Sequence, residues 1–130
     1  MAIEEALKAV LVADVPVFAV VANRIYPVAM PQDFTLPAIT FELNGGEIAR
    51  GLSGPAGKQN RIYAFRCYAK DFYQARDLME LVDTALDGYS DLTGAIHIHS
   101  IIMLHPGEDG YDSDADFFMR SAPFKVRYMR

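Results

Sequence analysis

The sequence is short of cations, of cysteine and of long apolar runs, and each shortage excludes a class of protein. Its 130 residues hold 12 Lys and Arg against 17 Asp and Glu, which gives a formal net charge of −5. Because neutralising phosphates needs a surplus of cations, this balance argues against nucleic-acid binding as the main activity. The single cysteine, Cys67, can form neither an internal disulfide nor a cysteine-rich zinc site, which fits a reducing compartment.

No stretch of the chain approaches the ~20 consecutive apolar residues that a membrane-spanning helix needs. The most apolar segment, Val10–Val21, is interrupted by Asp14 and Pro16. The first residues lack the basic and apolar regions of a secretory signal peptide. We therefore expect no membrane partner.

Length and composition are those of one globular domain. The chain falls within the ~100–200 residues of a typical domain. Hydrophobic residues make up 52% and charged residues 22%, which is typical of a chain that folds around one core. We predict a single domain over residues 1–130.

Hydrophobic periodicity predicts three helices. Apolar residues at helical spacing indicate one helix over Ile3–Ala13 and a second, short one over Pro16–Ala22, with Asp14 as its N-terminal cap. The third and longest helix is expected to begin after Asp71, which can cap it, and to end at Gly88.

Alternating patterns predict about five strands. They cover Arg24–Pro27, Ala38–Leu43, Arg61–Ala69, Ala95–Leu104 and Phe117–Met129. We predict an α+β fold, with a mainly antiparallel sheet and helices packed on one face.

The connections and the strand faces are predicted from turn residues and residue parity. Asn44–Gly46 is read as a turn, Glu47–Asn60 as a flexible glycine-rich loop or the tip of a long hairpin, and His105–Asp116 as an acidic loop. Pro123 has no N–H to donate, so we expect its strand to lie at an edge or to be kinked. Parity places four side chains of the fourth strand on its outward face: His97, His99, Ile101 and Met103. In the strand before the long helix, parity places Tyr63, Phe65, Cys67 and Ala69 inward.

Two segments imitate ligand-binding motifs without matching them. Gly51–Lys58 resembles a phosphate-binding loop, but Gln59 stands where Ser or Thr should bind magnesium, and a strand follows instead of a helix. Asp112–Asp116 resembles the start of a calcium loop, but Phe117 and Pro123 replace its required Gly and Glu.

The histidines are the remaining candidates for chemistry. His97 and His99 share a strand face, but two ligands are too few for a metal site, and a third would have to come from elsewhere. Cys67 has the inward parity of an inert buried thiol. We therefore predict no catalytic, cofactor-binding or metal-binding residues, and a protein that is not an enzyme.

Charge is distributed in blocks along the chain. Arg50–Lys70 and Arg120–Arg130 contain cations but no acid, Asp71–Asp91 is mainly acidic, and Glu108–Asp116 contains acids but no base. Complementary blocks on different surfaces could drive self-association into rings or filaments. Pairing of the same charges within one chain explains the pattern equally well.

Several segments together resemble the tail completion proteins of long-tailed phages, prophages and gene transfer agents, also called tail terminator or head–tail joining proteins. The resemblance extends over most of the chain and consists of strands, prolines and glycines without a catalytic signature. Its segments are Glu4–Val12, Asp14–Phe18, Arg24–Pro27, Met30–Gln32, Leu36–Phe41, Arg61–Ala69 and Leu86–Gly88.

This resemblance implies a structural role in the virion tail, assembled in the cytoplasm of a bacterial host. Such proteins form rings, commonly hexamers, at the head-proximal end of the tail tube, where they stop tube polymerisation and meet the head connector or stopper protein. Genome DNA passes through the lumen without specific binding. Candidate residues for a subunit or tube interface are Arg50, Lys58, Arg61, Arg66, Tyr68, Lys125 and Arg127. Candidates for an acidic lumen or interface are Asp109, Asp112, Asp114 and Asp116.

Two other functions remain open from the residues alone. One is a small α+β domain that binds a protein or a ligand without catalysis. The other is a hydrolase or metal enzyme that uses His97 and His99.

Overall fold

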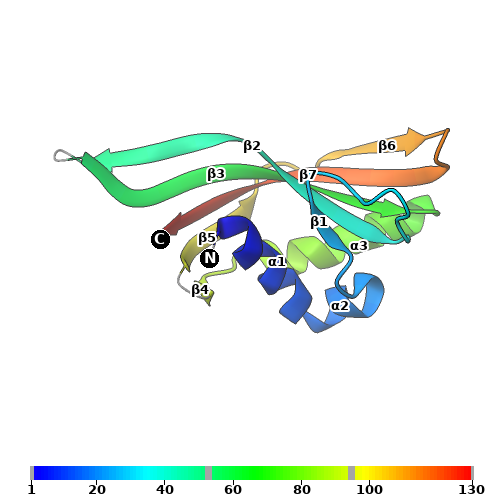
Figure 1. Ribbon diagram of the computed structural model, residues 1–130, viewed down its shortest axis with the longest axis horizontal. Coiled ribbons are helices and arrows are strands. Elements are labelled where there is room, and N and C mark those ends of the chain that lie inside the picture. Colours follow the sequence, from blue (N-terminus) through cyan, green and yellow to red (C-terminus); the bar gives the residue numbers. More distant parts are fainter. Residues whose placement is uncertain (1, 52–53, 94–95, 130) are drawn as a thin grey trace.

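The computed structural model in Figure 1 describes the backbone of residues 2–51, 54–93 and 96–129, with their side chains except 47–58, 92 and 93. This part of the chain forms three helices: α1 (Ile3–Ala13), α2 (Val15–Val21) and α3 (Phe72–Leu86). Its strands are β1 (Ile25–Pro27), β2 (Ala38–Gly51), β3 (Gly54–Ala69), β4 (Asp91–Thr93), β5 (Ile96–Met103), β6 (Glu108–Asp112) and β7 (Phe117–Met129).

The strands form one mixed sheet, and the three helices lie on one side of it (Figure 1). The strand order is β1-β2-β3-β7-β5-β4, with β6 also beside β7. β1 and β2 are parallel, and every other described pair is antiparallel. The predicted α+β class is confirmed, and the short strands β4 and β6 join the predicted five.

The helix boundaries follow the capping residues closely. The Asp14 side chain accepts a hydrogen bond of 3.2 Å from the backbone N–H of Val17, and Asp71 accepts one of 3.3 Å from Gln74. Both bonds satisfy N–H groups that a helix start leaves without a partner. The bounds predicted for α1 are confirmed, and α2 begins and ends one residue earlier than predicted.

The turn predicted at Asn44–Gly46 is wrong, because the chain continues there as one strand of a long hairpin. β2 and β3 pair from Ala38↔Tyr68 as far as Gly51↔Gly54, so the glycine-rich segment is the end of this hairpin. The glycines instead form a β-bulge. Gly46 has a φ of +140°, and a Cβ there would lie 2.3 Å from the Asn60 carbonyl oxygen.

β7 is an interior strand, so the edge position predicted from Pro123 is wrong. β3 pairs along one side of β7, while β5 and β6 share the other. The Pro123 carbonyl accepts a 2.9 Å bond from Leu104 just past the end of β5, and β6 pairs only with the earlier residues Phe117–Ser121. N–H and C=O of one strand residue point to the same side. The missing N–H therefore faces the junction between β5 and β6.

A second bulge, in β5, changes the face of the sheet to which the later residues of this strand point. Ile98 pairs with Tyr128 but Ser100 pairs with Arg127, so His99 is an extra residue in the strand. Beyond it the alternation changes face. Ile101, predicted to point outward, is buried, and Ile102 is 46% exposed.

The segment predicted as an acidic loop is partly a strand, because Glu108–Asp112 pairs with the first half of β7 as β6. Gly107 allows the chain just before β6 to lie close against β7. It has a φ of +93°, and a Cβ there would lie 1.9 Å from the Ser121 carbonyl oxygen.

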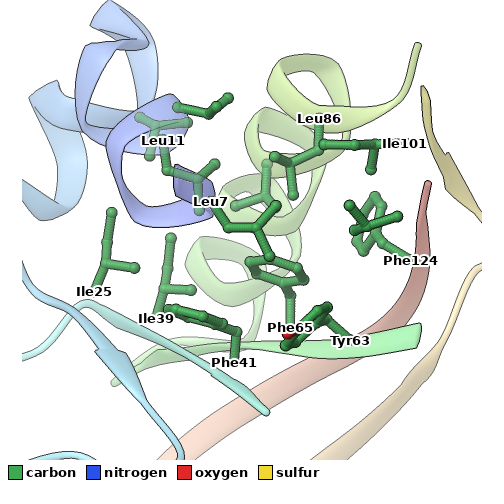
Figure 2. Packing of buried hydrophobic residues seen from close by; sticks show 14 of the residues in the cluster. Leu7, Leu11, Ile25, Ile39, Phe41, Tyr63, Phe65, Leu86, Ile101 and Phe124 are labelled. Atoms are coloured by element: carbon green, nitrogen blue, oxygen red, sulfur yellow. The ribbon is translucent and has the colours of Figure 1, made fainter. Parts of the chain in front are cut away.

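The core lies between the sheet and the helices (Figure 2). Phe65 occupies its centre, stacked on Phe41 at a centroid distance of 5.4 Å and edge-on to Phe124, also at 5.4 Å. Leu7 of α1 and Leu86 of α3 pack against the same cluster. The inward parity predicted for β3 is confirmed, since Tyr63, Phe65, Cys67 and Ala69 are all fully buried.

Replacing Phe65 by Ala should destabilise the fold by ~3–5 kcal/mol, because it leaves a cavity among three strands. Urea unfolding followed by circular dichroism measures this loss. Phe18→Ala is the matched control: Phe18 is 47% exposed, so the same truncation should cost much less. Equal losses in both variants would contradict the packing described.

Candidate interaction surfaces

The face of the sheet opposite the helices, here called the open face, has no helix over it in the described part of the chain (Figure 1). Strand alternation and register place on it most of the candidate interface residues with described side chains. It includes Thr40 and Glu42 of β2, Ile62, Arg66 and Tyr68 of β3, Ile102 of β5, and Ser121, Lys125 and Arg127 of β7.

One end of the open face is an aromatic cluster. The Tyr68 ring contacts Phe117 edge-on at a centroid distance of 5.1 Å, and Phe34 contacts Phe117 at 5.9 Å. The Thr40 hydroxyl donates a 3.2 Å bond to the Tyr68 hydroxyl. Tyr68 is half-buried by these contacts, so only part of it is available to a partner.

The middle of the open face is polar and slightly hollow. Arg66 forms an ion pair with Glu42 on the neighbouring strand. Beside them lies a cavity of about 110 Å³, lined by side chains that include Arg66, His105, Glu108 and Ser121. This arrangement of donors and acceptors suits a small polar group.

The other end combines apolar and basic side chains. Lys125 lies between Ile62 and the exposed Ile102 in the sheet register. Arg127, two residues further along β7, is exposed. This end therefore offers contact area together with positive charge.

Arg61 lies apart from the other candidates, on the helix side of the sheet. Its guanidinium is 3.7 Å from the Glu4 carboxylate of α1 and 5.7 Å from the centre of the Tyr128 ring. Tyr63 donates its hydroxyl to the same carboxylate, and burial together with this bond raises the pKa of Tyr63. These contacts fasten the start of α1 to β3.

The acidic candidates lie on β6 and the turn that follows it, and several have partners within the chain. Arg120 donates two hydrogen bonds, of 2.6 and 3.0 Å, to Asp109, which hold the pKa of Asp109 below its usual value. Tyr111 donates a 2.9 Å bond to Asp116. Asp112 accepts bonds from two backbone N–H groups of the turn. Part of the charge of the acidic block is therefore already paired with charge of a basic block in the same copy.

Arg50 and Lys58 belong to the far half of the β2–β3 hairpin, and their side chains lie outside the described residues.

The residues considered for chemistry do not gather at one site in the described part of the chain. The exposed rings of His97 and His99 lie 4.4 Å apart, whereas His105 accepts a hydrogen bond from the nearby Gly107. Over residues 2–51, 54–93 and 96–129, no three His, Cys, Asp or Glu side chains are grouped to hold a metal ion. Cys67 is fully buried, which raises the pKa of its thiol.

An exposed apolar patch on α2 is not among the predicted candidates. Val15 is 79% exposed and Phe18 47%, beside a hollow that Val12 and Ala19 also line. The segment Val15–Val21 is apolar on every side, so its sequence does not reveal which face stays uncovered. None of the described helices is long and apolar enough to span a bilayer.

The fold is similar to that of a known virion component. Neither a protein-family profile nor a curated protein matches the sequence. Among solved structures, a chain from the virion of a native gene transfer agent particle superimposes with a TM-score of 0.75 at 18% identity. The alignment covers 99% of this chain and 96% of that one, so the two share a fold over nearly their whole length.

Asp109→Asn should lower the free energy of unfolding at pH 7 by about 1 kcal/mol or less, because the pair with Arg120 is partly exposed to solvent. The folded state lowers the Asp109 pKa, so the pair stabilises the protein above the usual Asp value of ~3.9 and loses its effect as pH falls below it. Urea unfolding at several pH values should show a shallower loss of stability on acidification in the variant.

Asp77→Asn serves as the control, since Asp77 pairs with the adjacent Arg76 on the surface of α3 and so joins no two elements. It should leave the acid dependence unchanged. An Asp109→Asn variant with the acid dependence of the original protein would contradict a contribution from this pair.

Proposed function

We propose that the protein is a structural component of a phage or gene transfer agent virion, and that it forms a ring at the head-proximal end of the tail tube. There it ends tube polymerisation and joins the tail to the head. The observation that carries this proposal is the full-length fold similarity to a chain of a gene transfer agent virion.

The molecule's form is compatible with this role. A single domain of 130 residues can enclose a lumen only as several copies. Its open face and long hairpin offer separate surfaces to neighbouring copies, the tube protein and the head connector. The net charge of −5 disfavours adhesion to DNA, so an acidic lumen would let the genome pass without binding it.

A small binding domain without catalysis is the second candidate. The observation that favours it is the polar cavity beside Arg66, which is of a size for a small group. Such a domain would function as a monomer or dimer and would not recognise a tail tube.

Mixing the protein with a tail tube protein encoded in the same genome should limit tube length and leave a ring at one tube end. Electron microscopy measures both effects, and light scattering at several concentrations measures the mass of the free protein. An unrelated acidic protein of similar size is the control. Tubes of unchanged length without end density, together with a free monomer or dimer, would contradict the proposal and favour the binding domain.

A further inference from the structure

β2 is paired along its whole length on one side but only briefly on the other. β3 pairs with it from Ala38 to Gly51. On the opposite side, β1 pairs only with Ile39–Phe41. From Glu42 to Gly51 this second edge has no strand beside it within the described residues.

Beyond its pairing with β1, β2 directs backbone N–H and C=O groups outward along this edge. Ile39 donates a 3.0 Å bond to Arg24, and the Phe41 carbonyl accepts one of 2.8 Å from Val28. Alternate residues of a strand direct their N–H and C=O to the same side. The backbone groups of Leu43 therefore face the free edge, and its side chain is 53% exposed.

The far half of the hairpin lacks the support that the rest of the sheet receives. β7 pairs with β3 only from Lys58 onward, and before it only Gly54 and Pro55 pair with β2, beyond an irregularity in the register. Figure 1 shows this part extending past the helices. A two-stranded ribbon is marginally stable by itself in water, and a free edge of this length is a template for another strand.

We propose that a second copy of the chain covers this edge with the outer edge of its β6. This contact rests on the proposed ring function and specifies which surfaces meet in it. β6 also has no strand on its outer side within the described residues, and Figure 1 places it at the opposite end of the molecule from the hairpin tip.

Strand direction and charge both favour this partner. β2, β3, β7 and β6 are successively antiparallel, so β6 runs antiparallel to β2. Two copies with the same orientation would thus form an antiparallel ladder across the contact. Apart from Glu42, which pairs with Arg66, the hairpin contains Glu47, Arg50 and Lys58, a net charge of +1, whereas β6 and its turn contain only acids among their charged residues. Because the two surfaces differ, the contact is head-to-tail and can repeat around a ring.

Paired cysteines test the contact directly. Leu43→Cys is combined with Tyr111→Cys or, in a second variant, with Ser113→Cys; Tyr111 and Ser113 are both exposed. Cys67 can remain, because it is fully buried. Within one copy β3 and β7 separate β2 from β6, about 14 Å or more across the sheet, which is beyond the ~7 Å reach of a disulfide. Any disulfide between the new cysteines therefore joins two copies.

Mild oxidation of the assembled protein, in solution and on tail tubes, should give a ladder of covalent dimers and higher multimers on non-reducing gels. The matched control keeps Leu43→Cys and moves the second cysteine to Tyr73, which is 60% exposed on α3. It should give no ladder. Light scattering and electron microscopy show in the same samples whether rings form.

Rings that form without a ladder in either paired variant would overturn this contact and leave the proposed function standing. Absence of assembly both in solution and on tubes would overturn the two together.

Discussion

The packing of three aromatic rings across the centre of the sheet supports the rest of the fold. Phe41, Phe65 and Phe124 come from β2, β3 and β7, and their contacts hold these strands in one order under the helices. Burying each ring contributes roughly 1.5–3 kcal/mol, and each aromatic contact adds about 0.5–1.5 kcal/mol. Because this core commits one face of the sheet to the helices, the sheet itself is available to partners only through its open face and its strand edges.

The ion pairs of this molecule orient neighbouring elements relative to one another and add little to the free energy of unfolding. Arg120 fixes β6 against β7 through Asp109, and Arg61 holds the start of α1. Partly exposed pairs of this kind contribute about 0–1 kcal/mol each. These pairs use charges of the basic and acidic blocks within one copy. The distribution of charge along the sequence is therefore, by itself, weak evidence for how copies meet. The unpaired backbone of β2 is more informative, because a strand edge specifies direction and register.

The sequence predicted what local patterns determine and missed what a single inserted residue changes. Capping by Asp14 and helical spacing placed α1 and α2 to within a residue. Alternation assumes one residue per step, so the bulge at His99 put Ile101 on the wrong face. The same parity assigned the inward positions of β3 correctly. The contact of Arg61 with Glu4 joins residues far apart in the chain, and no local pattern contains it.

The proposed edge contact bears on how copies could close into a ring. Backbone pairing fixes the relative direction of two strands, and neighbouring strands are rotated by roughly 20–25° in a constant sense. A sheet continued from copy to copy would therefore curve in one direction. Edge pairing by itself does not fix where such a curve closes, so side-chain contacts must choose the number of copies. The open face is suited to this, because Lys125 and Ile102 combine charge with exposed apolar area in the row next to the polar cavity.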